Sequence, residues 1–129
     1  MRFPASLIYI AAIMGLLGSL FGCSRTLDPD EAVIIQLRKA GSDLSKSHSI
    51  DFYLYFADES AAQQAAVRMR QTGYQAEVKR AAKGENWLCL ATKQVVPELT
   101  TIQGITRDLD ALAKSLHGEY DGWEAKVEK

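Results

Sequence analysis

The chain has 129 residues, and its 15 lysine and arginine residues against 16 aspartate and glutamate residues give a formal net charge of −1. This length allows one domain and little more. Because binding to nucleic acid needs a basic face that neutralises phosphates, the near-neutral charge excludes a general nucleic-acid-binding protein.

An apolar leader opens the chain. Residues 7–20 are almost wholly apolar, and Leu-Phe-Gly-Cys-Ser follows at residues 20–24. An apolar run of this length that ends at a small residue predicts a secretory signal. A Cys directly after Leu-Phe-Gly resembles a bacterial lipobox, which implies that Cys23 carries a lipid and becomes the mature N-terminus. We therefore expect a signal peptide over residues 1–22 and a lipid-anchored tether over residues 23–27.

The leader also predicts the location of the protein. Ser24 after the cysteine resembles outer-membrane sorting, so we expect a lipid-anchored protein of the bacterial cell envelope that faces the periplasm. The alternative is an uncleaved inner-membrane signal-anchor, because residues 3–21 are just long enough to cross a bilayer. If Cys23 carries lipid, Cys89 has no disulfide partner within the chain and acts as a small apolar side chain.

A helix and a strand are expected after the tether. Asp28 suits an N-cap, Pro29 the first helical position and Glu31 the capping-box position, which predicts a helix over residues 28–40. Residues 42–49 are polar and rich in serine, as is typical of a loop. Residues 50–56 alternate between apolar and polar positions, which predicts a strand that turns Ile50, Phe52, Leu54 and Phe56 toward the core.

Two helices and two strands follow. Asp58 caps a helix that runs to about residue 72, and residues 74–79 alternate as a second strand. Residues 83–86 form a turn, and residues 87–92 a third strand. A helix that opens at Pro97 ends at Gly118, because glycine takes the left-handed conformation there without a steric penalty.

The stretch after Gly118 suits a fourth, short strand. It contains Tyr120 and Trp123, with Asp121-Gly122 expected as a bulge that re-aims the side chains on either side. This stretch either closes the core as a last strand or forms a recognition surface. If Trp123 faces the helices, Asp121 and Glu124 should be largely exposed.

The order of elements after the leading helix is β-α-β-β-α-β, which predicts an α+β, ferredoxin-like fold. This fold has a four-stranded antiparallel sheet with its two main helices on one face. The first and third strands lie at its centre, and the fourth lies at an edge beside the first.

Catalysis has little support in the sequence. His48 lies in the polar loop and His117 at a helix end, and neither has a cluster of ligands at zinc-binding spacing. Asp121 and Glu124 have no second acidic group to face them across a substrate. We expect no catalytic residue, no metal and no cofactor, and therefore no enzyme.

Several segments in order resemble the regulator of ribonuclease activity B (ribonuclease E inhibitor) family. They are Gly41-Ser42-Asp43-Leu44, Phe52-Tyr53-Leu54-Tyr55-Phe56, Ala65-Ala66, Gly73-Tyr74, Trp87-Leu88-Cys89-Leu90-Ala91 and the terminal Tyr120-Asp121-Gly122-Trp123-Glu124. Together they cover roughly residues 30–127, within an expected domain over residues 28–127. The resemblance implies the same fold and a regulator that binds a ribonuclease and damps it without doing chemistry.

These observations favour a domain that binds an unidentified protein partner. The candidate surface is the sheet face with its C-terminal edge, formed by Tyr53, Tyr55, Trp87, Tyr120, Asp121, Gly122, Trp123 and Glu124. Aromatic side chains are enriched at protein interfaces. Alternatively, the helix over residues 28–40 covers this face and the rings belong to the core. The second function hypothesis is a structural or accessory envelope lipoprotein with no link to ribonuclease.

Overall fold

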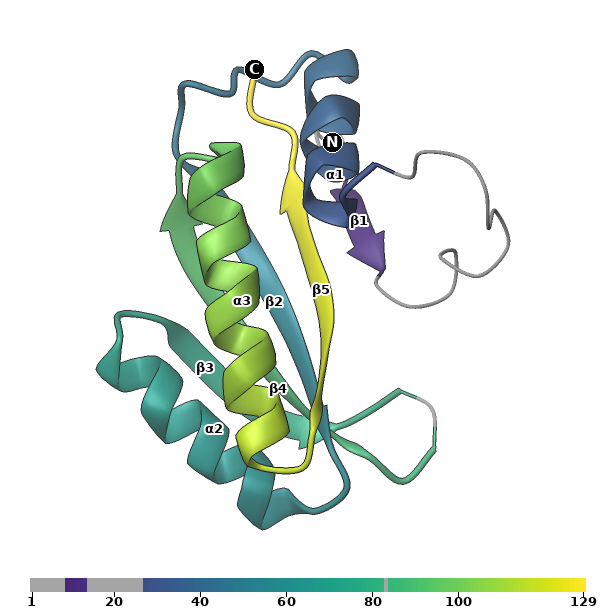
Figure 1. Cartoon of the computed structure of the whole chain (residues 1–129), viewed down its shortest axis with the longest axis vertical. Coiled ribbons are helices and arrows are strands. Elements are labelled where there is room, and N and C mark those ends of the chain that lie inside the picture. Colours follow the sequence, from purple (N-terminus) through teal and green to yellow (C-terminus); the bar gives the residue numbers. More distant parts are fainter. Residues whose placement is uncertain (1–8, 14–26, 83) are drawn as a thin grey trace, which may run out of the picture.

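The computed structural model describes residues 9–13, 27–82 and 84–129 (Figure 1). Cys23 and most of the expected signal peptide and tether lie outside these residues. The elements in chain order are β1 (Tyr9–Ile13), α1 (Pro29–Lys39), β2 (His48–Phe56), α2 (Glu59–Gln71), β3 (Gln75–Arg80), β4 (Trp87–Val95), α3 (Leu99–Ser115) and β5 (Glu119–Lys126). Among the described residues, no helix combines the length and apolar character needed to cross a membrane.

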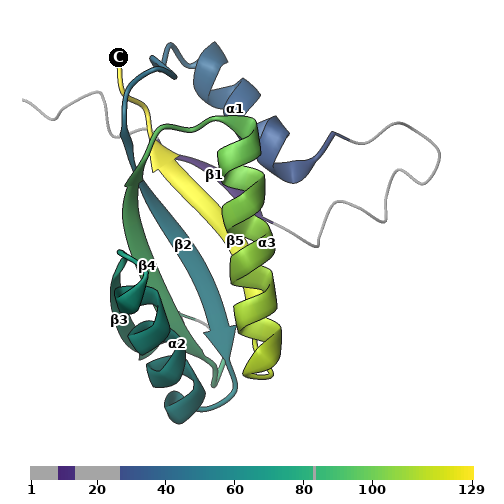
Figure 2. The same cartoon turned by 60° about the vertical axis from the view of Figure 1, so that its left-hand side comes forward.

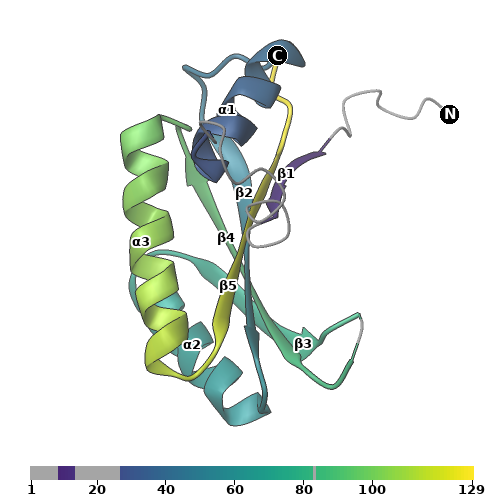
Figure 3. The same ribbon diagram turned by 45° about the vertical axis from the view of Figure 1, so that its right-hand side comes forward.

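The sheet has the order β1-β5-β2-β4-β3, and every neighbouring pair is antiparallel. From β2 to β5 the chain follows the predicted β-α-β-β-α-β order, with β2 and β4 at the centre. The three helices lie on one side of the sheet (Figures 2 and 3). The ferredoxin-like α+β prediction is therefore confirmed. The sequence analysis did not predict β1, a fifth strand from within the leader that pairs with the outer edge of β5.

The core lies between the sheet and the helices. Along β2 the residues alternate between buried and half-buried, and the buried set is His48, Ile50, Phe52, Leu54 and Phe56. Among the residues whose burial the structure describes, the buried apolar cluster comes from the three helices, from β2, β4 and β5, and from Val127. These described core residues all belong to the part of the chain that follows the leader.

Small side chains let α2 approach the sheet closely. The N-cap Asp58 accepts a hydrogen bond from the backbone N–H of Ala61 at 2.8 Å, as its position predicted. The buried residues of α2 are Ala62, Ala65, Ala66 and Met69. In α3, Ile102, Leu109 and Ala113 are buried, and the flanking leucines are partly buried against the same cluster.

Two strands extend by two or more residues beyond their predicted bounds, and β3 is shifted by one residue. Strand β2 starts at His48, two residues before the predicted start, and β4 continues to Val95 rather than ending at residue 92. The antiparallel register pairs His48 with Val95, so each extension supplies hydrogen-bonding partners for the other. His48 is consequently a fully buried strand residue and not part of the polar loop.

A bulge interrupts β5, as predicted. Tyr53 pairs with Gly122 and Leu54 pairs with Tyr120, so Asp121 has no counterpart on β2. Gly122 has a φ of 122°, a conformation that side chains of L-residues rarely adopt. The extra residue reverses the alternation of side chains, so residues after the bulge point to the face opposite the one they would have in a regular strand. Tyr120 and Trp123, three residues apart, are therefore both buried.

The end of α3 corrects the role expected for Gly118. The left-handed residue is His117, with a φ of 59°, and Gly118 does not have a positive φ. Glycine is required at position 118 because a Cβ there would overlap the ring of Phe56 and lie 2.6 Å from the backbone oxygen of Tyr55. Glycine at position 118 was predicted because of its left-handed conformation. In the structure it is needed because a Cβ would collide with Phe56 and Tyr55.

Gly118→Ala should therefore destabilise the domain by several kcal/mol, at least as much as the roughly 1–3 kcal/mol typical of overpacking, because a backbone atom is in the way. Gly104→Ala is the matched control. It lies inside α3 with only the flexible end of Arg107 within 4 Å, and should stabilise by up to about 1 kcal/mol. Urea unfolding of both variants tests this, and equal stabilities would contradict the close approach.

Candidate functional site

The two aromatic residues of the terminal motif point into the protein, and one of them holds α1. The indole Nε1–H of Trp123 donates a hydrogen bond of 2.9 Å to Oδ1 of Asp30. Trp123 is 1% exposed and Asp30 is 3% exposed, so the bond lies in the interior. It joins β5 to the first turn of α1 across 93 positions of sequence.

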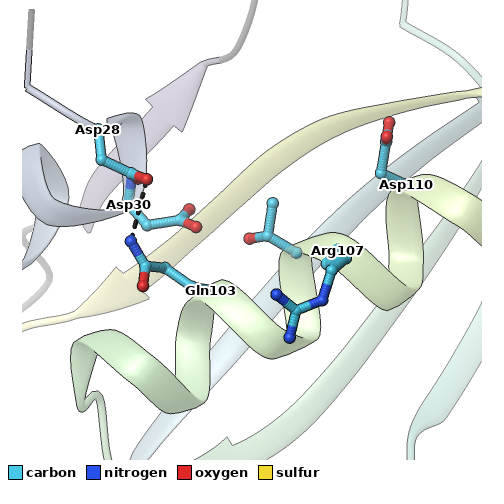
Figure 4. A pocket seen from close by; sticks show the side chains of 6 residues that line it. Asp28, Asp30, Gln103, Arg107 and Asp110 are labelled. Atoms are coloured by element: carbon cyan, nitrogen blue, oxygen red, sulfur yellow. Dashed lines mark hydrogen bonds between the residues drawn. The ribbon is translucent and has the colours of Figure 1, made fainter.

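Asp30 is positioned by the start of α1. Asp28 is the N-cap, and its Oδ1 accepts a hydrogen bond of 2.8 Å from the backbone N–H of Asp30. From α3, Nε2 of Gln103 donates to Oδ2 of Asp28 at 3.0 Å. Figure 4 shows both bonds, with the Asp30 carboxylate between the two helices. The predicted cap therefore also anchors α1 to α3.

Burial makes Asp30 unusual among the carboxylates. Desolvation raises the pKa of Asp30 above its ordinary value, and the nearby Asp28 raises it further. The hydrogen bond from Trp123 and the nearby hydroxyl of Thr106 act in the opposite direction. The buried hydroxyls of Thr106 and Tyr120 lie near each other. Within the described residues, neither is at the distance and angles of a hydrogen bond to a partner.

A polar pocket of about 400 Å³ opens beside this cluster, between α1 and α3 (Figure 4). Its lining residues are Asp28, Asp30, Gln103, Thr106, Arg107 and Asp110. Its polar groups are three carboxylates, one guanidinium, one amide and one threonine hydroxyl, and no histidine, cysteine or serine lines it. In the part of the chain that the structure describes, no group of three or more His, Cys, Asp or Glu residues is placed to hold a metal ion.

The opposite face of the sheet carries two of the aromatic residues predicted for binding, Tyr53 and Tyr55. Tyr53, Tyr55 and Leu90 are half-buried, and the strand register places the two tyrosines beside Leu90 and the buried Leu88 of β4. These four residues are called the open-face patch below. The three helices lie on the other side of the sheet, and α1 packs on α3 and β1 (Figure 3). The alternative in which α1 covers the tyrosines is therefore wrong.

Carboxylates border the open-face patch. The Tyr53 hydroxyl donates a hydrogen bond to the Glu124 carboxylate, and Thr92 Oγ1 donates to Oδ1 of Asp51 at 2.8 Å. Burial, followed by this bond to Glu124, raises the pKa of Tyr53. Strand register and the bulge place five carboxylates and two ammonium groups of described residues on this face: Asp51, Glu77, Glu119, Asp121 and Glu124, with Lys79 and Lys126. The face is acidic.

The remaining predicted residues lie elsewhere. Trp87 pairs with Phe56 and so faces the helix side, where the guanidinium carbon of Arg80 lies 5.0 Å from its ring centroid. Tyr120 and Trp123 are buried on that side too, and Gly122 is buried in the bulge. The prediction that Trp87, Tyr120 and Trp123 extend the binding face is wrong, because each belongs to the helix-side register.

The two acids of the terminal motif are on the open face but are not largely exposed. Asp121 and Glu124 are both half-buried. Burial and the neighbouring Glu119 raise the pKa of Asp121. The structure thus brings together Tyr53, Tyr55, Asp121 and Glu124 from the predicted set.

The sequence analysis missed a buried Ser–His pair. Oγ of Ser42 lies 2.6 Å from Nε2 of His48, and Nδ1 of His48 lies 2.8 Å from the backbone oxygen of Lys46. The backbone N–H of Glu128 donates to Oγ of Ser42 at 3.0 Å. Both side chains are buried, and His48 faces a backbone carbonyl rather than the carboxylate of a catalytic triad. Through the hydrogen bond from Glu128, the pair ties the C-terminus to the loop before β2.

Trp123→Phe tests the hydrogen bond to Asp30 separately from the ring. The variant keeps most of the buried surface but leaves a buried carboxylate without its indole donor, which should cost about 1–3 kcal/mol. Trp123→Ala also loses the ring and should cost about 3–5 kcal/mol. Thermal melts measure both losses, and a Trp123→Ala protein that melts like wild type would contradict the buried position.

Asp30→Asn tests the electrostatics of the same contact. The pKa of Asp30 is raised from 3.8, so the folded chain binds this proton more tightly than the unfolded chain. The contribution of Asp30 to the free energy of unfolding therefore falls as pH rises through the raised pKa, and the loss is complete above it. The asparagine variant keeps an acceptor oxygen without titrating. Between about pH 3.5 and about pH 7, its stability relative to wild type should increase. A difference that does not change with pH would refute the raised pKa.

Comparison with protein families gives a match over residues 27–125 to the family described as RraB, regulator of ribonuclease activity B. A search of curated proteins gives no match. The matched region starts before α1 and ends one residue before the last residue of β5, so it includes both Asp30 and Trp123. Because the match covers more than half of the sequence and contains the three helices with β2, β3, β4 and most of β5, this chain belongs to the regulator of ribonuclease activity B family.

Proposed function

We propose that this chain is a non-enzymatic regulator that binds a protein partner through the open face of its sheet and is carried on an envelope lipoprotein. Family membership supports a regulatory, protein-binding role. The open-face patch with its acidic border is the observation that supports this face as the binding surface. The resemblance to ribonuclease inhibitors makes a ribonuclease the first partner to test.

The composition of this face suits recognition of a protein. A centre of two tyrosines and two leucines resembles the aromatic-rich core of an interface, and charged groups around it resemble a polar rim. Tyrosine contributes a large contact area at a low cost in conformational entropy. The Tyr53–Glu124 hydrogen bond fixes one ring before binding, which lowers that cost further.

The charge of the face favours a basic segment of the partner. Five carboxylates against two ammonium groups create a negative potential, which steers a positively charged surface and suppresses an acidic one. A ribonuclease carries basic surface because its substrate is a polyanion. The interaction should therefore weaken as the salt concentration rises.

The anchor is supported by the sequence alone. The apolar run at residues 7–20 and the Leu-Phe-Gly-Cys sequence that follows it indicate lipidation of Cys23. A lipid at this cysteine would place the domain in the cell envelope and facing the periplasm, so its ribonuclease or other partner must be accessible there. An uncleaved signal-anchor would place it at the inner membrane.

The double variant Asp121→Asn with Glu124→Gln tests the face. It removes two charges from the acidic border and should leave the free energy of unfolding within about 1 kcal/mol. Surface plasmon resonance with purified ribonuclease E should show binding that weakens roughly tenfold in the variant, mainly through slower association.

The matched control is Glu59→Gln with Asp108→Asn, which removes the same charge from exposed positions on α2 and α3. It should bind like wild type. Equal losses in both double variants would contradict the open face as the binding surface. Failure of the wild-type chain to bind would contradict a ribonuclease partner and favour an accessory envelope lipoprotein.

Cys23→Ser tests the anchor. We expect the variant either to be released from membranes or to accumulate as an unprocessed precursor, because serine offers no sulfur for lipid attachment. Cell fractionation and gel mobility of wild type and variant are the measurements, with Cys89→Ser as the control for loss of a thiol. An unchanged membrane fraction together with unchanged mobility would favour an uncleaved signal-anchor.

A further inference from the structure

The outer edge of β5 is occupied by a strand that processing would remove. β1 pairs with β5 in antiparallel register from Tyr9, opposite Lys126, to Ile13, opposite Gly122 (Figures 1 and 3). Residues 9–13 lie inside the expected signal peptide, whereas β5 belongs to the matched domain. The same chain therefore contains an edge and a segment that fits it, on opposite sides of the processing site at Cys23.

Removal of β1 would leave β5 as an edge strand. In this sheet β5 pairs with β2 on its inner side, so its outer side would then present unpaired backbone N–H and C=O groups over residues 122–126. Such an edge is a template for another strand. The bulge lies at the start of this stretch, and from Trp123 to Ala125 the register with β2 is regular. The segment contains no proline that would remove a donor.

We propose that in the processed chain this edge, residues 122–126 of β5, binds an extended apolar segment of a partner protein in the antiparallel register that Tyr9–Ile13 takes. The proposal rests on the proposed cleavage before Cys23. The chemistry of the occupant follows from the segment that already pairs there, Tyr-Ile-Ala-Ala-Ile, which has aliphatic or aromatic ends and two small central residues. Main-chain hydrogen bonds would supply affinity, as in other cases of strand addition.

This arrangement makes partner binding depend on export. Before processing, β1 is covalently linked to the domain and competes for the edge at a high effective concentration. After cleavage that competitor is lost and the edge becomes free. The edge borders the open-face patch through Glu124, which bonds to Tyr53, so one partner could contact both surfaces.

The test compares two forms of the protein by hydrogen exchange of backbone amides. One form is the full chain in detergent micelles, and the other begins at residue 24 and keeps every buried apolar residue that the structure describes, from Val33 to Val127. Among the β5 amides at residues 122–126, those that point to the outer edge should exchange at least roughly tenfold faster in the shorter form. The amides of β2 report on folding and should stay protected in both forms.

A synthetic peptide with the sequence of residues 7–15, extended by two lysines for solubility, is the probe for the empty edge. It should restore protection of the fast amides in the shorter form. The matched control is the same peptide with both Ala11→Pro and Ala12→Pro. Because the N–H groups of successive strand residues point to opposite sides, one of the two prolines removes a donor to β5, and this peptide should not protect. Equal protection in the long and short forms, or equal effects of the two peptides, would overturn the proposal.

A variant of the full chain keeps the test decisive if the shorter form is poorly folded. Ala11→Pro together with Ala12→Pro in the full chain should release the same amides, and the unmodified peptide should protect them again. A dimer of the shorter form that buries β5 would show that a second copy takes the edge, and would overturn the assignment to a partner strand. These measurements use chains of defined length, so they are independent of ribonuclease binding and of lipidation in cells.

Discussion

The hydrogen bond between Trp123 and Asp30 is the contact on which the arrangement of this domain depends. It pairs a buried indole N–H with a buried carboxylate, and a carboxylate without a partner in the interior is costly. Because Asp30 lies in the first turn of α1, the bond places that helix on the same side of the sheet as α2 and α3. The opposite face is left without a helix, and that face carries the tyrosines and carboxylates of the proposed binding surface.

The bulge at Asp121–Gly122 lets residues 120–124 supply side chains to both the helix-covered face and the open face of the sheet. In a regular strand, residues three apart lie on opposite faces, so Tyr120 and Trp123 could not both be buried. The bulge shifts the register, and both rings then face the helices while Asp121 and Glu124 both face outward. The terminal motif of the family thus has two roles: its aromatic residues hold the core, and its acids belong to the open face. The stretch is therefore the closing strand of the core, and its two acids lie on the face that we propose for recognition.

The same strand connects the regulatory proposal with the export proposal. One side chain of β5, Glu124, bonds to Tyr53 on the open face, and the backbone of β5 pairs with a segment of the leader. A buried free thiol at Cys89, with its pKa raised by burial to about 11, is consistent with a purely structural role for that cysteine in the core. The groups that the two proposals use are the tyrosines and carboxylates of the open face and the outer edge of β5.

The sequence by itself determined the order and type of the elements from residue 28 onward, because caps, alternation and helical spacing are local signals. Asp58, the alternation in β2 and Asp121-Gly122 were each predicted in the role that the structure gives them. Only the tertiary structure decided which face each aromatic residue occupies, since Trp87 follows from its register with Phe56 and Trp123 from the bulge. It also decided that Asp30 is buried against a residue 93 positions away and that Gly118 is needed for space beside Phe56. These facts depend on contacts between distant segments, and no local pattern in the sequence encodes them.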